Sequence, residues 1–570
     1  MRSFTHWLRV LLYAPVLVVC AGPALAQQAA PRPVPIDPGQ SEKSFDAEQE
    51  RRRFGRPPVA VPSIARPQAA GDTKPLFVLK SVAIEGAIAI PAESFSDLYA
   101  SLIGRKVSQA DLLSITNGIT ERYRAEGFHL SRAVIPPQDI KRGRIRVQVI
   151  EGSFTELEVA GNDDDTFGVR KILGAALNES PSRLSTLERQ LLIANDIAGV
   201  RVVDTAIDEI GTATGRFRLI VKLKTWRAYT SIGTDTYGTR ATGPWTAYST
   251  AALNSTIAPG DSLAVNLSTV PDATKELRYG RVSYDVPVGL DGAKLGGSFS
   301  RGEVWPGDIR RTFDDHTISR GYELRGSIAP LQTRKATLTL SVTGNWNDPS
   351  EKTSLGYLYE DHTRQVSAMA DLRVQDPLNG WNYATFAYRR DLNVFGATQQ
   401  NDPMSSRFDA SPNASIYAYS YVRLQPLIDP WSLKAGVSGQ FASGPLLNSQ
   451  TYYLGGAAFG PGYVNGDNGY SGNVELRFDQ KPQLPFLKGY QLYAFVDGGR
   501  VWNMDSERLS VASAGAGIRI LIQDDLTASF AVAAPVYYSF KTDEVSKVRF
   551  LFAISSAIKW CPSQADPVCT

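Results

Sequence analysis

The feature of this sequence that most constrains its fold is a long tract, residues 226–560, without helical periodicity. Its segments alternate small or polar residues with apolar or aromatic ones, as in residues 262–270 (SLAVNLSTV) and 527–538 (TASFAVAAPVYY). A period of two places every second side chain on one face of a β-strand. Roughly 20 residues per strand and turn predict about 16 antiparallel strands, and an even number is typical of a bacterial membrane barrel.

A transmembrane β-barrel fits these strands better than the alternatives, a soluble sandwich or a propeller. Segments of about 9–11 residues with Tyr or Trp near their ends match a bilayer and its aromatic girdles. The mean hydropathy is −0.18, and no apolar run of about 18 residues follows the N-terminal region, which excludes a bundle of transmembrane helices. The alternating strands of a membrane barrel are themselves only mildly hydrophobic.

Composition and motifs give no indication of an enzyme. The chain has 4 His and 3 Cys, and the His are scattered along it. It contains no phosphate-binding G-x-x-x-x-G-K-[ST], no H-E-x-x-H and no G-x-S-x-G. A formal net charge of +3 is too small to indicate a nucleic-acid partner. We therefore expect no catalytic residues, no cofactor and no metal.

The N-terminus predicts export from the cytoplasm. Residues 1–26 read as a secretory signal peptide, with Arg2 and Arg9 as its positive region. Residues 10–20 form the apolar core, and Ala24-Leu25-Ala26 is the cleavage site. The alternative, a membrane anchor, would need a longer apolar run.

Cleavage removes Cys20 and leaves two cysteines, Cys561 and Cys569, in a short tail of residues 561–570. Because an exported chain meets an oxidising compartment, a disulfide between them is our hypothesis, with two free thiols as the alternative. Residues 27–75 have the Pro-rich composition of a linker. Within it, residues 41–54 (SEKSFDAEQERRRF) predict a short helix, acidic at its start and basic at its end, or else a solvated charged stretch.

Residues 76–152 predict a module of order β-α-α-β-β. The first strand is expected over residues 77–86 and the first helix over 91–103. Ser108 is expected to cap a second helix that ends at Gly127. The apolar face of this helix comprises Leu112, Ile115, Ile119 and Tyr123. Strands over residues 131–138 and 144–152 complete the module.

Residues 153–225 repeat the same order, so a period of roughly 75 residues predicts a tandem of two small α+β modules. Ser185 and Glu188 have the spacing of a capping box ahead of its second helix. The last two strands are expected over residues 202–210 and 216–224.

Residues 119–152, which contain an Ile-Pro-Pro-Gln segment and end in Ile-Glu-Gly, carry a family resemblance. Over about residues 77–560 the chain resembles the outer-membrane transporters of two-partner secretion, the TpsB-type or ShlB/FhaC/HecB haemolysin secretion/activation family of the POTRA-barrel superfamily. The resemblance implies two periplasmic POTRA modules, here 76–152 and 153–225, and a barrel in the outer membrane of a Gram-negative cell.

Two barrel motifs of that family have counterparts here. Phe495, Asp497 and Gly499 match its F-x-D-x-G strand motif. Residues 452–472 match its loop that folds into the lumen, with Gly460-Pro461-Gly462-Tyr463 where the family has V-R-G-Y/F at the tip. In the family the tip Arg pairs with the strand Asp, and here Pro461 replaces it.

The departure leaves Asp497 in need of another donor, because a carboxylate in a confined lumen is costly unless it is hydrogen-bonded or paired. Three candidates follow from the sequence: Tyr463, a backbone N–H of the Gly-rich tip, or a wall arginine such as Arg423 or Arg477. An ordinary water-filled polar position is the alternative for Asp497, and a flexible surface loop is the alternative for the tip.

The resemblance implies a monomeric pore among outer-membrane lipids that secretes a TpsA-like exoprotein with an N-terminal secretion domain. Without ATP in the periplasm, folding outside the cell would give direction to transport. We expect the POTRA modules to bind the unfolded client by strand addition. The first candidate is the strand over residues 144–152, which carries Arg144, Arg146 and Gln148, together with the helix over 108–127 beside it. The strand over residues 216–224 is the second. The helix over 41–54 and the inward loop would then move aside. The alternatives are a barrel-assembly factor and a passive porin.

Overall fold

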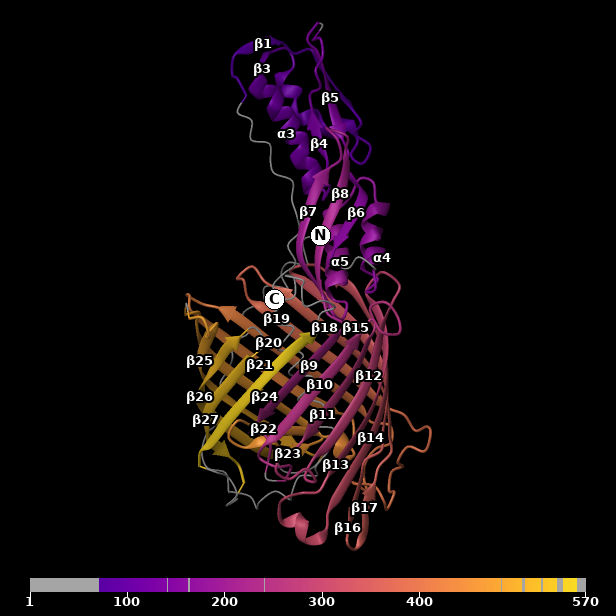
Figure 1. Cartoon of the computed structure of the whole chain (residues 1–570), viewed down its shortest axis with the longest axis vertical. Coiled ribbons are helices and arrows are strands. Elements are labelled where there is room, and N and C mark those ends of the chain that lie inside the picture. The colour runs from indigo at the N-terminus through magenta and orange to yellow at the C-terminus, as the bar shows by residue number, and fades with distance from the viewer. Residues whose placement is uncertain are drawn as a thin grey trace.

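The computed structural model describes residues 71–560, with gaps at 141, 162–164, 240, 483, 505–507, 524–525 and 541–546, and only the backbone at 461, 523 and 560. The predicted signal peptide, the helix over 41–54 and the Cys561–Cys569 pair lie outside the described residues. The described part shows two small modules stacked as an arm on one end of a barrel (Figure 1). The predicted fold class is confirmed: two β-α-α-β-β modules, then an antiparallel barrel.

The first module is built on a three-stranded sheet. In it β5 (Arg144–Ile150) runs parallel to β2 (Ser81–Glu85) and antiparallel to β4 (Arg132–Val134). Helix α3 (Gln109–Ala125) is held at its start by a capping box between Ser108 and Asp111. The predicted apolar face of α3 is buried, which confirms this helix and its cap.

Two predicted elements of the first module are wrong. The strand expected over 77–86 divides into β1 (Pro75–Val78), which pairs with β3 (Lys106–Ser108), and β2. The break occurs because the N–H of Leu79 donates to the Arg105 carbonyl, whereas that of Lys80 donates to Gly143. The helix expected over 91–103 consists of two 3₁₀ segments, η2 (Ala92–Leu98) and η3 (Ala100–Leu102). Its Ser and Asp residues favour turns over a regular α-helix.

The second module repeats the topology. Its sheet has the order β6 (Ser153–Ala160), β8 (Arg216–Thr225), β7 (Val200–Glu209). The helical elements are α4 (Val169–Leu173), η4 (Gly174–Asn178) and α5 (Leu184–Asn195). The predicted capping box is wrong, because α5 begins at Leu184 after Arg183, and Ser185 already lies within the helix.

Side-chain contacts join the modules to each other and to the barrel. Arg132 on β4 donates two hydrogen bonds to Glu209 on β7, at 2.7 and 2.9 Å. Asp196, next to α5, accepts from Gln332 at the periplasmic end of the barrel wall, 2.7 Å away. These contacts fix the arm at the end of the barrel where the strand-to-strand turns are short.

Sixteen antiparallel strands close the barrel, and the first pairs with the last. They are β9 (Ala228–Asp235), β10 (Thr246–Asn254), β11 (Ser262–Thr269), β12 (Arg278–Val288), β13 (Ala293–Val304), β14 (His316–Gln332), β15 (Ala336–Asn347), β18 (Thr363–Gln375), β19 (Trp381–Asp391), β20 (Ser415–Pro426), β21 (Trp431–Ala442), β24 (Asn468–Gln480), β25 (Gly489–Trp502), β26 (Arg508–Gln523), β27 (Leu526–Tyr538) and β28 (Arg549–Trp560).

Two further hairpins belong to the extracellular loops. β16 (Ser350–Thr353) and β17 (Gly356–Glu360) extend the wall beyond β14, and a short 3₁₀ segment, η5 (Ile309–Phe313), lies nearby. β22 (Tyr452–Gly456) and β23 (Gly460–Gly466) pair only with each other and follow η6 (Asn448–Gln450).

The wall strands separate an apolar outer face from a polar lumen. Leu324 and Val496 are exposed on the outside, whereas their neighbours Glu323 and Asp497 carry charge on the inside. This alternation is the pattern from which the strands were predicted. No helix in the described ranges is long and apolar enough to cross a membrane.

Candidate functional site in the barrel lumen

The β22–β23 hairpin, residues 452–466, lies inside the barrel against the wall, and we call it the lumen hairpin (Figure 1). Leu454 and Val464 are buried, and they pack with Val501, Val511 and Leu551 of the wall. Burial of several aliphatic side chains, each worth about 1.5–3 kcal/mol, is the main force that holds the hairpin in place.

The three residues of the strand motif alternate on β25, so all three face the lumen. Asp497 accepts one hydrogen bond from the Ser513 hydroxyl at 2.5 Å and one from the Ala457 N–H at 3.3 Å. The Ser513 oxygen also accepts from the Ala458 N–H, at 3.4 Å. The carboxylate and the hydroxyl together bind the turn of the lumen hairpin.

Glycines allow this close approach. A Cβ on Gly499 would lie 2.7 Å from Leu454 Cδ1, and one on Gly456 would lie 2.4 Å from Asp497 Oδ1. Phe495 stacks beside Tyr493 and lies over Gly515, where a Cβ would be 2.6 Å from its ring. In physical terms, Phe495 fills the lumen wall, Asp497 binds the turn and Gly499 leaves room for the hairpin.

Of the three donors considered for Asp497, the structure shows the backbone N–H of the tip. Ser513 is the second donor, and no sequence motif pointed to it. Arg423 and Arg477 bind other carboxylates: Arg423 bonds to Asp376 at 2.6 Å, and Arg477 bonds to Glu475 at 2.5 Å.

At the tip itself, the Tyr463 ring stacks on Phe540 and contacts Phe459. Gly460 and Gly462 have φ values of +85° and +65°, a left-handed backbone that only glycine adopts at low cost. The conformation of the tip therefore depends on the two glycines that flank position 461.

An arginine does reach the tip, but it comes from the wall. Arg549 at the start of β28 donates to the Ala457 carbonyl at 3.5 Å. It also donates to the carbonyls of Thr236 and Gly238, just after β9, at 3.1 and 2.5 Å. One guanidinium thus connects the lumen hairpin with the place where the first and last wall strands meet. The alternation of residues 547–560 is enough to place Arg549 on the lumen face. No sequence pattern identifies the Ala457 carbonyl as its partner.

The base of the lumen hairpin is held by Asp467, which is fully buried. Arg407, from the extracellular loop over residues 392–414, donates to its carboxylate at 2.6 Å. The N–H groups of Leu446 and Met504 donate to the same carboxylate at 2.9 and 3.1 Å. No local sequence pattern predicts this contact, because 60 residues separate the two partners.

Comparisons with known proteins agree with this architecture. Residues 77–152 match the ShlB-type POTRA domain, and residues 219–520 match the haemolysin secretion/activation protein ShlB/FhaC/HecB. The chain belongs to this family. It is an outer-membrane protein of the two-partner secretion type, with its POTRA modules in the periplasm.

Several relatives resemble this family member over most of their length. The heme/hemopexin transporter protein HuxB of Haemophilus influenzae is 22% identical over 479 residues, 78% of this chain and 81% of the relative. The outer membrane transporter CdiB of Dickeya dadantii is 22% identical over 471 residues, 78% and 79% of the two chains. The solved structure of CdiB from Escherichia coli has a TM-score of 0.71 at 18% identity and covers 91% of this chain and 98% of its own. This chain and CdiB from Escherichia coli therefore share a fold.

Both POTRA strands that were predicted to bind the client lie between two other strands of their sheets. β5, which carries Arg144, Arg146 and Gln148, lies between β2 and β4. Beyond the end of β4, the Gln138 side chain bonds both backbone groups of Arg146, at 2.8 and 2.7 Å. β8, the second candidate, is likewise central, between β6 and β7. Strand addition is therefore blocked along β8 and over the part of β5 that β4 covers, because a strand with two neighbours has no free edge. A client contact at Arg144 or Arg146, beyond the end of β4, stays a prediction.

Proposed function

We propose that this protein binds an unfolded exoprotein in the periplasm and moves it through the barrel to the cell surface without ATP. One observation carries the proposal. The lumen is occupied by a hairpin that apolar packing and hydrogen bonds hold against the wall, and a two-module arm stands at the periplasmic end of the barrel. A passive porin would need an open lumen, whereas a client-operated pore needs a removable occupant.

The edge strand β7 is the better place for client capture. It has ten residues, and in the described part of the chain its outer edge pairs with no other strand. Ile210 donates inward to Arg216, so by alternation the N–H of Ile207 faces outward. An extended client segment could add here through main-chain hydrogen bonds, with little demand on its sequence.

A pair of substitutions tests this edge. Ile207→Pro removes the outward N–H, whereas Ile207→Thr keeps it and loses similar side-chain packing. We expect Ile207→Pro to reduce export of exoproteins encoded in the same genome at least tenfold, and Ile207→Thr to reduce it little. Equal export by both variants would move client capture to another edge.

Removal of both POTRA modules tests the whole proposal. The truncated protein should insert as a folded barrel, seen as a heat-modifiable band, and export nothing. Normal export by the truncated protein would overturn the proposal. A loss of many unrelated outer-membrane barrels on depletion of the full protein would instead indicate an assembly factor.

Movement of the lumen hairpin is tested with a cysteine pair. A Cβ on Gly456 would lie 3.0 Å from Ser513 Oγ, which suits a disulfide between Gly456→Cys and Ser513→Cys. In a background with Cys561→Ser and Cys569→Ser, oxidation should stop export and reduction should restore it. Each single-cysteine variant is the control, because Gly456→Cys crowds Asp497 and Ser513→Cys removes its hydroxyl donor without any crosslink. Export by the oxidised double variant would show that the hairpin does not move.

A further inference from the structure

Three consecutive wall strands carry an outward-facing arginine near their extracellular ends: Arg278 on β12, Arg301 on β13 and Arg320 on β14. Each lies on the same strand face as a large exposed apolar residue, Val282, Phe299 and Tyr322 respectively. The three side chains therefore stand at the border between the lipid-facing band and the cell surface. We call them the arginine cluster.

The positive charge of the cluster is only partly neutralised. Arg301 is ion-paired with Glu303, whereas the described residues provide no ion pair for Arg278 or Arg320. Arg278 instead lies over the Trp305 ring at 5.7 Å and donates to the Thr274 carbonyl. Arg301 and Arg320 are register partners, and like charges directly opposite each other destabilise a sheet. An anion at this position would remove that repulsion.

Two cavities on the outer wall lie beside the cluster. One, of about 640 Å³, is lined by Arg278, by Arg301 with its ion-pair partner Glu303, and by Ile232, Leu267 and Gly280. Because Gly280 has no side chain, the wall is recessed there between longer apolar neighbours. An apolar recess that ends at arginines suits a chain molecule with an anionic head.

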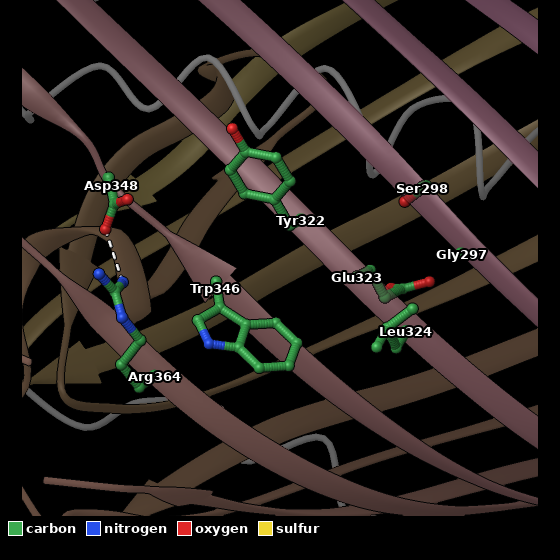
Figure 2. Close-up of a pocket in the computed structure, with 8 residues that line it drawn as sticks. All are labelled: Gly297, Ser298, Tyr322, Glu323, Leu324, Trp346, Asp348 and Arg364. Carbon is green, nitrogen blue, oxygen red and sulfur yellow. Dashed lines mark hydrogen bonds and ion pairs between the residues drawn. The ribbon is translucent and has the colours of Figure 1, made fainter. Parts of the chain in front are cut away.

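The second cavity, of about 520 Å³, lies over β13, β14 and β15 and reaches the start of β18. Figure 2 shows Tyr322, Leu324 and Trp346 around it. Arg364 and Asp348, joined by a 2.6 Å ion pair, lie at one end. Leu324 and the recess at Gly297 lie at the opposite end. Both cavities thus combine an apolar trough with an arginine near the cell surface, which in the second cavity is ion-paired with Asp348.

Outward-facing arginines are arranged differently at the periplasmic end of the wall. There the outward-facing Arg423 on β20 is ion-paired with Asp376 at 2.6 Å and bonds to Asn382. Other outward-facing arginines, by the same alternation, stand near the extracellular ends of β18, β19, β25 and β26: Arg364, Arg390, Arg500 and Arg508. The arrangement matches a membrane whose outer leaflet carries the negative charge.

We propose that the arginine cluster and its two cavities bind a phosphorylated, multiply acylated glycolipid of the outer leaflet. Its phosphate groups contact Arg278, Arg301 and Arg320, since guanidinium groups bind phosphate oxygens through paired, charge-assisted hydrogen bonds. Its acyl chains lie in the troughs at Gly280 and Gly297. This lipid site is separate from the lumen and does not depend on the proposed secretion activity.

The test uses the full-length protein in detergent micelles and measures retained lipid by native mass spectrometry after titration with purified rough lipopolysaccharide. The variant Arg278→Gln/Arg301→Gln/Arg320→Gln should bind at least tenfold more weakly than wild type. The charge-matched control Arg105→Gln/Lys171→Gln/Arg201→Gln changes three exposed periplasmic residues and should bind like wild type.

Two further measurements use the wild-type protein and so do not depend on folding of the variant. Enzymatically dephosphorylated lipopolysaccharide should bind at least tenfold more weakly than the intact lipid. Phosphatidylglycerol, which offers one phosphate and two chains, should compete only at large excess. Equal binding of the dephosphorylated lipid, equal binding by the triple variant, or full competition by phosphatidylglycerol would each overturn the proposal.

Discussion

The extracellular loops of this barrel contain two hairpins that point in opposite directions. The lumen hairpin turns inward, and its Leu454 and Val464 are buried. The β16–β17 hairpin, residues 350–360, which we call the outer hairpin, continues the wall outward, and Leu355 at its turn is 92% exposed. The difference between them shows what allows a loop to enter a barrel.

Small residues at the turn decide the direction. Residues 455–458 of the lumen hairpin are Gly-Gly-Ala-Ala, and their backbone lies against Asp497 and Ser513. Residues 354–358 of the outer hairpin, Ser-Leu-Gly-Tyr-Leu, are too bulky for such contact. In this member of the family, close backbone contact and apolar packing hold the loop, and no arginine–aspartate pair is needed at the tip.

The two hairpins share one anchor in the loop over residues 392–414. Arg407 bonds to Asp467 at the base of the lumen hairpin, at 2.6 Å. Its neighbour Ser406 donates its N–H to Asp361 at the base of the outer hairpin, at 2.8 Å. Both aspartates are fully buried, but within the described part of the chain only Asp467 has a cationic ion-pair partner. The anchors therefore differ in charge and offer a way to separate the hairpins experimentally.

The largest effect is expected from Arg407→Met. This change leaves Asp467 buried without its partner, at a cost of about 3–5 kcal/mol, which should release the base of the lumen hairpin. The open probability of the full-length protein in planar bilayers should rise more than tenfold. The double variant Arg407→Met/Asp467→Asn should recover most of the closed state. A silent single variant would show that the apolar contacts suffice.

A second, smaller effect is expected from Gly499→Val, which places side-chain atoms where Leu454 packs. Overpacking of this kind costs about 1–3 kcal/mol, so the hairpin should be displaced and the open probability should rise several-fold. Gly326→Val is the matched control on the wall, because a Cβ there meets Leu295 at an ordinary 3.5 Å. Similar conductance of both variants would argue against a close fit of the hairpin at Gly499.

The sequence alone predicts the local features of this structure, but it does not predict contacts between distant segments. Strand alternation and the helix cap at Ser108 are local patterns, because each depends on residues within a few positions. The contact between Arg407 and Asp467 depends on where two distant loops meet, and no local pattern encodes that. The central position of β5 was missed for a related reason. Alternation reports which face of a strand is covered, and it does not report which strands lie beside it.

A third prediction concerns pH and the outer hairpin. Burial raises the pKa of Asp361 to about 6, whereas in an unfolded chain it is about 3.9. Its protonated form is thus favoured in the folded loop. The resulting stabilisation is complete below about pH 4 and is lost as pH rises through 6. Between pH 7.5 and pH 5 the anchor should therefore gain about 1–2 kcal/mol.

Hydrogen exchange of loop amides, corrected for intrinsic rates, measures this gain. Protection near Ser406 should be greater at pH 5 than at pH 7.5 in the wild type, and independent of pH in Asp361→Asn. The amides around Asp467 serve as the internal comparison. A pH dependence that persists in Asp361→Asn would assign the effect to another group.

The smallest effect is expected at the tip, from Arg549→Gln. The guanidinium bonds to the Ala457 carbonyl at 3.5 Å, a long contact, and its shorter bonds go to the wall after β9. Its loss should cost the hairpin about 1 kcal/mol, or roughly a fivefold rise in open probability. Arg549→Lys should lose less, because it keeps a charged donor. If Pro461→Arg lowers the open probability of Arg549→Gln, an arginine on the loop can replace one on the wall. If instead Arg549→Gln opens the pore as widely as Arg407→Met, the tip, and not the base, controls the lumen hairpin.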